Sequence, residues 1–374
     1  MAFLDTVLDE PVPEPCLLEG PRMERFAARL AREGYTLEGC AARVGCHPRL
    51  GVNFFEELRP KWVPSPDSPV DVLLSLFIAG HDVNLDRCST LLSEPVLGDA
   101  LEMKLLVREG DRVRSDLCLF PCYGRYVVTD RARKNKAINQ VMWLWSESFI
   151  LGGMVKRVPR ARAIDLCTGS GIHAILASAH CEEVVGVDIS PRAIAFSTFN
   201  QRLNGVANAR FLQGDLWGPT EGTCDLLLAN PPYSPDLGSG AGDNFWSGGP
   251  SGTELLARVV GGLPARLNDR GVCHIVALYP NPPGTTTAEH FNQWLGGQLH
   301  GYQVLDHSWP VPGWADPLSI KPFAGDKRAW RFGVVSLRKV TQTDRGYWRQ
   351  VGVGKFFDAR GECVVIADHD AVSA

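Results

Sequence analysis

The 374-residue sequence predicts an α/β fold over its second half and a mainly helical domain before it. From about residue 160 onward, short apolar runs alternate with segments whose apolar residues recur every three or four positions. This alternation is typical of strands and crossover helices around a largely parallel sheet. Before residue 130 the order is different, because helical segments come first and short β segments separated by glycines follow them.

The first half predicts helices and then a hairpin, which is the order of a winged helix. Such a domain could recognise a substrate or pair with a second copy of the chain. The length favours about two domains. We place an N-terminal domain at 1–135, a catalytic domain at 136–340 that opens with a helix over about 136–152, and a C-terminal hairpin extension at 341–374. The expected helices are 21–33, 37–44, 69–78 and 85–92, and the expected strands are 102–107, 112–120 and 126–130.

Residues 163–178 predict a strand, a glycine turn and a helix. Gly169 and Gly171 allow the backbone to approach a ligand without a Cβ in the way, and the helix that follows begins with unpaired N–H groups. A second apolar run ends in Asp188, whose carboxylate could bind both hydroxyls of a ribose. With Ala174, the same positions also satisfy the pattern of dinucleotide-binding proteins, so a nicotinamide-dependent enzyme is a competing interpretation.

The sign of the charge favours S-adenosylmethionine as the cofactor. Asp165 lies in the first strand, where a carboxylate could hold the cationic amino group of an amino-acid moiety but would repel a pyrophosphate. Asp215 follows the third predicted strand, at a place where it could accept a hydrogen bond from the adenine amino group. Leu216 could pack on the adenine ring.

The tetrapeptide Asn230-Pro231-Pro232-Tyr233 follows the apolar run 226–229. The Asn230 side-chain oxygen and the Pro231 carbonyl are two acceptors, and the prolines make the turn stiff and free of competing N–H donors. The flat face of Tyr233 lies beside them in sequence. Such a turn suits a planar NH₂ group, so we predict Asn230, Pro231 and Tyr233 as the catalytic residues.

In this order the motifs resemble the class I S-adenosylmethionine-dependent methyltransferases, and among them the HemK/PrmC/PrmB type, which methylates the side-chain amide nitrogen of glutamine. The resemblance covers about 160–340 and implies a Rossmann-like, seven-stranded catalytic domain. It also implies that Thr168, Ile189 and Asn230 join the cofactor-binding residues. The matching segments are Asp165–Gly171, Val187–Ser190, Gly214–Leu216, Asn230–Tyr233 and the glycine loop Gly248–Gly252.

Three functions stay open at this point. The first is an N-methyltransferase acting on a protein glutamine or a small planar-nitrogen metabolite, by direct in-line displacement with no metal. The second is a methyltransferase for adenine N6 or guanine N2 in RNA or DNA, because the same tetrapeptide serves those enzymes. The third is a cofactor-binding regulator without catalysis, against which the intact tetrapeptide argues.

Composition argues against a general nucleic-acid field, because the formal net charge is −4 and the pI about 6.2. A local exception is a group of basic residues near the domain boundary, which could contact phosphate groups. No segment has the ~20 consecutive apolar residues of a membrane span, and the N-terminus lacks a basic export signal, so we expect a cytoplasmic protein with no membrane contact. The basic residues near the boundary are Arg112, Arg114, Arg125, Arg131, Arg133, Lys134 and Lys136.

The last third predicts a helix at 253–267, a strand at 272–278, and an antiparallel pair of strands at 302–309 and 330–337. Residues 310–328 would form a substrate lid or a surface insertion, and 347–366 an added hairpin. A second triplet, Asn281-Pro282-Pro283, lacks the aromatic residue, so we interpret it as a loop.

Overall fold

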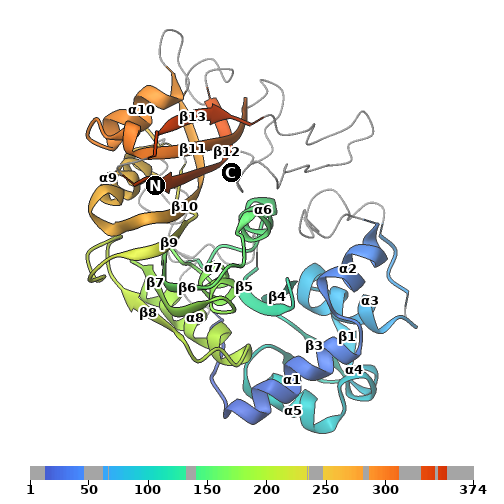
Figure 1. Ribbon diagram of the computed structural model, residues 1–374. Helices are drawn as coiled ribbons and strands as arrows, with labels where there is room; N and C mark the ends of the chain where they lie inside the picture. Colours follow the sequence, from blue (N-terminus) through green and yellow to red (C-terminus); the bar gives the residue numbers. More distant parts are fainter. Residues whose placement is uncertain are drawn as a thin grey trace, which may run out of the picture. The chain divides into compact units, whose positions relative to one another are not determined.

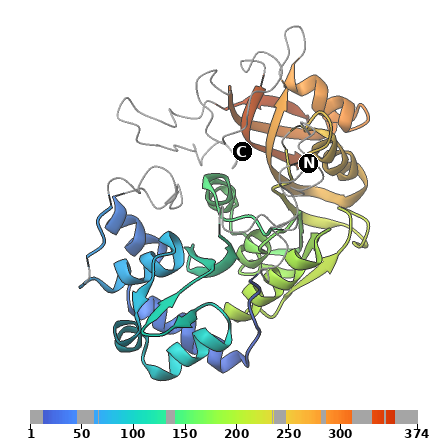
Figure 2. The same cartoon turned by 180° about the vertical axis from the view of Figure 1, so that it is seen from behind.

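The computed structural model describes residues 13–45, 62–65, 67–131, 140–233, 235, 247–280, 286–310, 330–341 and 344–351. The chain divides into two compact units, and the path of the chain can be followed in Figures 1 and 2. Unit 1 comprises Met1–Phe149, Gly169–Leu176 and Ser190–Ala207, and unit 2 comprises Ile150–Thr168, Ala177–Ile189 and Asn208–Ala374. Each unit has its own hydrophobic core, so each is described by itself.

Unit 1 is mainly helical, as predicted. The Ser68 and Thr36 side chains each accept a backbone N–H at the start of a helix, which is the usual role of these residues at that position. A further helix, Glu94–Glu102, was not predicted, and the strand expected over 102–107 is found instead at Val107–Glu109. The helices are α1 (Gly20–Arg32), α2 (Leu37–Val44), α3 (Pro69–Leu74) with its π-helical continuation η2 (Ser75–Ala79), α4 (Leu85–Leu92) and α5 (Glu94–Glu102).

The predicted β segments of unit 1 form two separate sheets. β1 (Val83–Asn84), β2 (Val107–Glu109) and β3 (Arg112–Arg114) pair antiparallel in the order β1-β3-β2. β4 (Leu117–Cys122) and β5 (Arg125–Asp130) form a hairpin of their own. The strand expected over 112–120 is therefore two strands. The helices and hairpins follow the predicted order, and the winged-helix interpretation stays a prediction.

The helix α8 (Pro191–Leu203) belongs to unit 1, and two asparagines at its C-terminal end form side-chain hydrogen bonds with the backbone of β5. The Asn200 side chain accepts from the Val128 N–H at 2.8 Å and donates to the Val128 carbonyl at 2.9 Å. Asn204 bonds in the same way to the N–H and carbonyl of Tyr126. Four residues along a helix span about 6 Å and two residues along a strand about 6.8 Å, so the two amides match alternate residues of the strand.

Unit 2 contains an eight-stranded sheet in the order β13-β11-β12-β10-β9-β6-β7-β8. The five strands from β8 to β10 are parallel, while β12 runs antiparallel to both β10 and β11. The strands are β6 (Arg160–Leu166), β7 (Cys181–Asp188), β8 (Ala209–Gln213), β9 (Cys224–Ala229), β10 (Leu267–Pro280), β11 (Tyr302–Pro310), β12 (Trp330–Lys339) and β13 (Tyr347–Gln350).

Seven of these strands are the ones predicted, including the final antiparallel pair. The eighth, β13, pairs parallel with β11, so the first arm of the expected C-terminal hairpin joins the main sheet. The rest of that hairpin, the 311–328 part of the insertion and the triplet at 281–283 lie outside the described residues.

Two helices cover one face of this sheet. α9 (Glu254–Arg266) and α10 (Thr287–Trp294) lie side by side, as both ribbon views show, and bury apolar residues against the strands. On the other face, Ile150 and Leu151 pack with Val276 and Phe332. These two residues belong to α6 (Ser146–Met154), which begins about ten residues later than the predicted linking helix. The shorter helices are α7 (Ile172–Ala177) and the 3₁₀ turn η3 (Leu299–Gly301).

The fold brings the predicted site segments to one edge of the sheet. In parallel strands all carboxyl ends meet at the same edge, and ligands of open α/β sheets bind outside that edge. The segments ending in Asp188, Gln213 and Ala229 are carboxyl ends of β7, β8 and β9. Asp188, Asp215 and Asn230 therefore lie at the edge where a ligand of this fold binds.

A first prediction concerns the amide ladder of α8, by which we mean the hydrogen bonds of the Asn200 and Asn204 side chains to β5. Asn200 is fully buried, and its removal would leave the Val128 N–H and two buried carbonyls, of Val128 and Ser170, without these bonds. We expect Asn200→Ala to lower the free energy of unfolding by about 2–4 kcal/mol, measured by urea denaturation. The exposed Arg202 on the same helix is the control, since Arg202→Ala should change it by less than about 0.5 kcal/mol. Equal effects of the two changes would contradict the ladder.

A second prediction concerns Glu147, whose side chain is buried. Burial raises its pKa to about 7, against the opposing effect of hydrogen bonds from its own backbone and from Ser146. The folded state therefore keeps a proton that the unfolded state releases, so stability falls as pH rises from about 4.5 to 7. This loss amounts to about 3 kcal/mol.

We expect Glu147→Gln to remove this part of the pH dependence and to stabilise the protein at pH 8 relative to the parent. Denaturant unfolding at pH 5, 6, 7 and 8 measures it. Glu182→Gln, at an exposed position, should keep the parent's profile. A Glu147→Gln variant with an unchanged profile would show that the carboxyl is ionised in the folded protein throughout.

Candidate active site

The end of β6 carries a buried carboxylate. Asp165 is fully buried, and its Oδ2 accepts a hydrogen bond from the Thr168 hydroxyl at 2.5 Å. The Thr168 N–H in turn donates to the Val187 carbonyl at 2.9 Å, which ties the end of β6 to the end of β7. Two predicted cofactor residues, Asp165 and Thr168, are thus directly bonded to each other. The neighbouring β7 is held against them.

The glycine turn after β6 adopts the backbone that only glycine takes easily. Gly169 and Gly171 have φ of +52° and +82°. A Cβ added at Gly169 would meet no atom of the described residues within 4 Å, so those residues leave the space beside it open. The positive φ explains why the sequence needs glycine here, and the open space explains how a ligand could reach the backbone.

The charges of three carboxylates act on Cys167, which itself has an uncommon left-handed backbone with φ of +57°. Burial raises the pKa of the Cys167 thiol well above its usual range. The carboxylates of Asp188, Asp165 and Asp215 raise this pKa further, and the Arg258 guanidinium lowers it. Because such effects weaken with distance, each of the four charged side chains lies within electrostatic range of this thiol. The balance is negative and suits a ligand with cationic and hydrogen-donating groups.

The ends of β7 and β8 form the next part of the site. The Asp188 carbonyl accepts from the Gly214 N–H at 2.9 Å, so the loops that carry the second and third motifs are joined. The Asp188 side chain is half-buried, while Ile189 after it is 62% exposed, a large apolar side chain without cover among the described residues. An exposed isoleucine at this edge can pack on the flat face of a bound ring.

The third motif is arranged differently from the sequence expectation in one respect. Leu216, with φ of +48°, is only 6% exposed and packs in the core of unit 2. Asp215 is exposed, and its Oδ2 pairs with the Arg258 guanidinium at 2.6 Å. Nothing in the sequence points to Arg258, because it lies 43 positions further along the chain.

The tetrapeptide after β9 contains a buried acceptor. Asn230 Oδ1 is buried and accepts no hydrogen bond within the part of the chain that the structure describes. Leaving a buried carbonyl without a partner costs on the order of 1–3 kcal/mol. Pro231 beside it is buried and has no N–H that could serve as a donor. The orphaned oxygen is therefore poised for a donor that is not part of the described chain.

Tyr233 is anchored rather than free-standing. Its ring is 4% exposed and meets the Phe332 ring edge-on, with the centroids 5.6 Å apart. The glycine loop packs on the same turn, backbone against backbone. A Cβ at Gly248 would lie 2.8 Å from the Pro232 carbonyl oxygen, and one at Gly252 would lie 2.8 Å from that of Tyr233. The turn is held on two sides, and Phe332 is a supporting residue that the sequence analysis did not identify.

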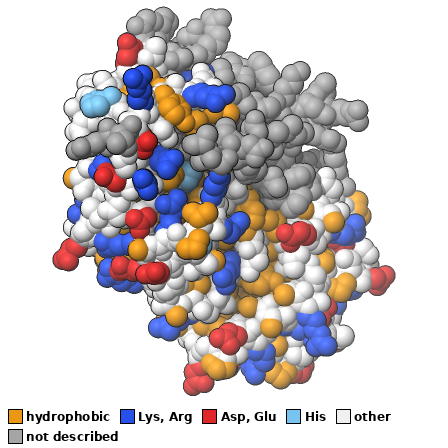
Figure 3. Space-filling model, in the orientation of Figure 1, with side chains coloured by type: hydrophobic (Ala, Val, Ile, Leu, Met, Phe, Trp, Pro, Cys, Tyr) orange, Lys and Arg blue, Asp and Glu red, His pale blue; other side chains and the backbone are white. Residues whose placement is uncertain are grey.

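The basic residues near the domain boundary serve internal bonds where the structure describes them. Arg131 is buried and donates to the carbonyls of Leu76, Phe77, Ile78 and Leu117. In Figure 3, basic and acidic side chains are interspersed over the visible face. Arg133, Lys134 and Lys136 lie outside the described residues. The other three donate within unit 1: Arg112 to the Asp82 carbonyl, Arg114 to Glu109 and Asp116, and Arg125 to the Asn204 carbonyl.

Among the described residues, no three His, Cys, Asp or Glu side chains are grouped so that they could hold a metal ion. Within the same ranges, no helix combines the length and the apolar character that a bilayer crossing requires.

The residues present fit S-adenosylmethionine by their charge and shape. The three carboxylates around Cys167 match a ligand with ammonium, hydroxyl and amino groups, and the open space at Gly169 admits it. The exposed Ile189 offers an apolar surface for an adenine ring. A dinucleotide would instead place its pyrophosphate next to these carboxylates, which like charge disfavours.

Comparison with known proteins agrees. Residues 147–293 match the model of the methyltransferase small domain. A Methanocaldococcus jannaschii protein that carries the name protein N5-glutamine methyltransferase is 32% identical over 135 residues, which are 35% of this chain and 68% of that protein. The ribosomal protein uL3 glutamine methyltransferase of Xanthomonas campestris is 33% identical, over 32% of this chain and 45% of that enzyme.

The ribosomal RNA small subunit methyltransferase C of Alcanivorax borkumensis is 28% identical, over 39% of each chain. This chain thus spans less than half of the latter two relatives. A solved structure of M. jannaschii TYW2 in complex with AdoMet overlaps 61% of this chain at 15% identity, with a TM-score of 0.41, a similarity too low to transfer function. The similarity to the M. jannaschii protein, with the ordered motifs and their geometry, establishes that this chain belongs to the methyltransferase small-domain family and is an S-adenosylmethionine-dependent methyltransferase.

Proposed function

We propose that this enzyme methylates the side-chain amide nitrogen of a glutamine in a protein. The observation that supports this most is the buried Oδ1 of Asn230, which accepts no hydrogen bond from the described residues. An amide NH₂ has two N–H groups in one plane. Asn230 Oδ1 and the Pro231 carbonyl would each accept one of them.

We further propose which residues bind the cofactor. Asp165, oriented by Thr168, would hold the ammonium group, and the backbone at Gly169 and Gly171 would lie along the amino-acid moiety. Asp188 would bind the ribose hydroxyls. The adenine would contact Ile189, Asp215 and the loop at Leu216, and Asn230 would lie where the cofactor and the acceptor meet.

The catalytic work of the chain would be mainly positioning. When bound, S-adenosylmethionine supplies a methyl group already activated by the sulfonium charge. The lone pair of an amide nitrogen is delocalised, and two acceptors on its N–H groups favour the pyramidal form that attacks. Tyr233, fixed by Phe332, would limit the rotation of the planar group. The prolines keep the acceptors in place, since their φ angles do not vary.

The relatives support a protein acceptor over a nucleic acid. Two of the proteins above are named for glutamine methylation, and one for ribosomal RNA. Of the four described arginines of the basic cluster, Arg131 is buried and Arg114 is paired with two carboxylates, which leaves fewer of them for phosphate groups. The N-terminal domain would then serve to recognise the protein acceptor. The homodimer, the cytoplasmic location and the domain boundaries stay predictions.

Asp188→Ala tests the cofactor assignment. A carboxylate that binds two hydroxyls makes charge-assisted hydrogen bonds, so its loss should weaken S-adenosylmethionine binding by about 2–4 kcal/mol, measured by calorimetry. Glu182→Ala removes an exposed carboxylate from the same strand and should leave the affinity unchanged. Unchanged affinity in Asp188→Ala, or tight binding of NAD by the parent protein, would contradict the assignment.

Asn230→Ala tests the chemical step. The parent protein, incubated with methyl-labelled cofactor and a lysate fractionated into protein, nucleic acid and small molecules, should label the protein fraction, and acid hydrolysis should release methylamine. Asn230 should contact the acceptor most strongly in the transition state, so its removal should lower kcat on the order of 100-fold or more while cofactor affinity changes little.

Asn281→Ala is the matched control, because its Asn-Pro-Pro triplet lacks the aromatic residue, and it should keep the parent's rate. Equal losses at Asn230 and Asn281 would show that the active site is misplaced. Label in the nucleic-acid fraction alone would replace the protein acceptor by an RNA or DNA base, and no label in any fraction would favour a regulator without catalysis.

A further inference from the structure

The loop after β8 and the helix α9 line an open hollow of about 700 Å³. Only ten residues connect β8 to β9, and they contain no helix, whereas crossover connections between parallel strands usually contain one. The space beside α9 is therefore left open. Its lining consists of Gly214, Asp215, Leu216, Trp217, Gly218 and Pro219 from the loop, and Arg258 and Gly261 from the helix.

The loop is seated firmly on the helix. A Cβ at Gly262 would lie 2.2 Å from the Trp217 ring, so only glycine allows the indole to lie this close to α9. The indole N–H donates to the Val259 carbonyl at 3.3 Å. At the other end of the loop, a Cβ at Gly214 would lie 2.7 Å from the Pro219 ring. These contacts fix the backbone that carries Asp215.

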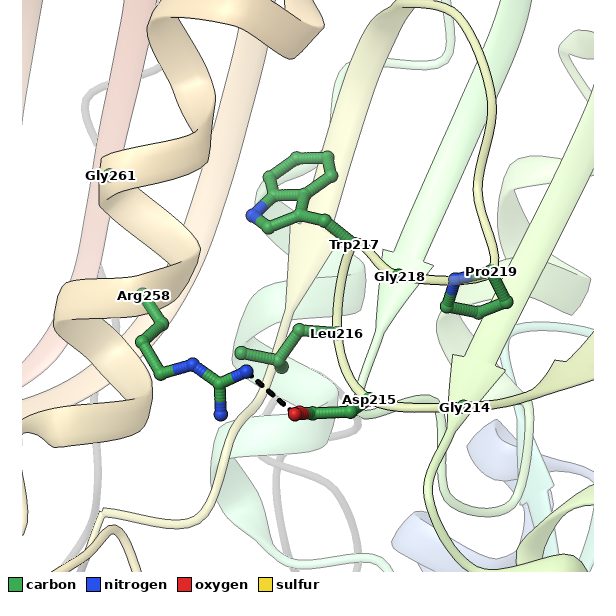
Figure 4. A pocket seen from close by; sticks show the side chains of 8 residues that line it. All are labelled: Gly214, Asp215, Leu216, Trp217, Gly218, Pro219, Arg258 and Gly261. Atoms are coloured by element: carbon green, nitrogen blue, oxygen red, sulfur yellow. Dashed lines mark hydrogen bonds and ion pairs between the residues drawn. The ribbon is translucent and has the colours of Figure 1, made fainter.

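Across this hollow, Asp215 and Arg258 point toward each other, with Leu216 beside them (Figure 4). Arg258 donates to Oδ2 at 2.6 Å, and in the part of the chain that is described no hydrogen bond to Oδ1 is found. Both side chains are 52% exposed. An ion pair this exposed adds little to fold stability, so stability does not explain its presence.

Both charges of this pair influence the pKa of a thiol at the proposed cofactor site. Asp215 and Arg258 both act on the Cys167 thiol, together with Asp165 and Asp188. The pair thus belongs to the charged residues that act on Cys167, and Asp215 is the member for which contact with adenine is proposed. A carboxylate held through one oxygen presents the other in a defined direction, and a planar amino group needs such an acceptor.

We infer that Arg258 is a positioning residue for the nucleobase: it holds Asp215 through Oδ2 so that Oδ1 receives the 6-amino group of adenine. Arg258 itself does not touch the base. It sets the selectivity of the cofactor pocket for a purine with an amino group at position 6. This role rests on the cofactor site and is independent of the identity of the methyl acceptor.

The test uses two ligands that differ only in this amino group: S-adenosylhomocysteine, and its analogue with unsubstituted purine in place of adenine. Calorimetry of the full chain should show the parent binding the purine analogue about 10- to 100-fold more weakly. Arg258→Met should weaken S-adenosylhomocysteine about 5-fold and leave the purine analogue within about 2-fold, since Arg258 acts only through the amino group. Arg258→Lys should restore part of the difference.

Arg210→Met is the control. Arg210 lies on β8 and pairs with Glu183 at 2.8 Å, and the two side chains are 53% and 47% exposed. The Arg210→Met substitution therefore removes the same charge as Arg258→Met from an equally exposed ion pair. It should change neither affinity. Equal losses for both ligands in Arg258→Met, or an unchanged adenine preference, would overturn the role of Arg258 alone. A parent that binds neither ligand would overturn the cofactor site, whereas failure of the protein-acceptor proposal would leave these affinities as they are.

Discussion

The concentration of negative charge around Cys167 is the constraint on which the site depends. Asp165, Asp188 and Asp215 come from three different strand ends, and all act on the same thiol. Thr168 supplies a hydroxyl to one of them and Arg258 a guanidinium to another. A ligand that brings an ammonium group and several donors completes the balance, and a phosphate would upset it.

The turn Asn230–Tyr233, where the methyl acceptor is proposed to bind, lacks within the described chain a donor rather than a cation. Asn230 Oδ1 is buried beside a proline and accepts no hydrogen bond from the described residues. The surrounding chain keeps this arrangement in place: the glycine loop presses on the turn from one side, and Phe332 holds the Tyr233 ring from another. In a more flexible turn, Asn230 Oδ1 could accept a hydrogen bond from the protein itself. The gain in free energy when a ligand donates to this oxygen would then be smaller.

The glycine loop also begins the helix that carries Arg258, so one segment serves both halves of the site. Glu254 receives N–H groups of Ser251 and Thr253 at the start of α9. One turn later, Arg258 reaches Asp215. The acceptor turn thus packs on the loop that begins α9, and Asp215 pairs with a side chain of the same helix.

The sequence by itself determined the parallel α/β sheet and its motifs, since strand and helix periodicity, positive-φ glycines and an acidic strand end are local properties. It predicted seven strands correctly, and it predicted that Asp165, Asp188, Asp215 and Asn230 lie at or near strand ends. It misjudged the strand over 102–107, of which only Val107 belongs to a strand, and the strand over 112–120, which divides between two sheets.

Only the tertiary structure decided which distant residues support the site. The Asn200–Asn204 spacing is visible in the sequence, but its partner, the edge of β5, is more than 70 positions away. Arg258, Phe332 and the eighth strand carry no local signal either, because an ion pair, a ring contact and an added strand are defined by what lies opposite. Backbone preferences depend on neighbouring residues, so the sequence predicts them. Which distant side chains and strands pair depends on how the whole chain folds.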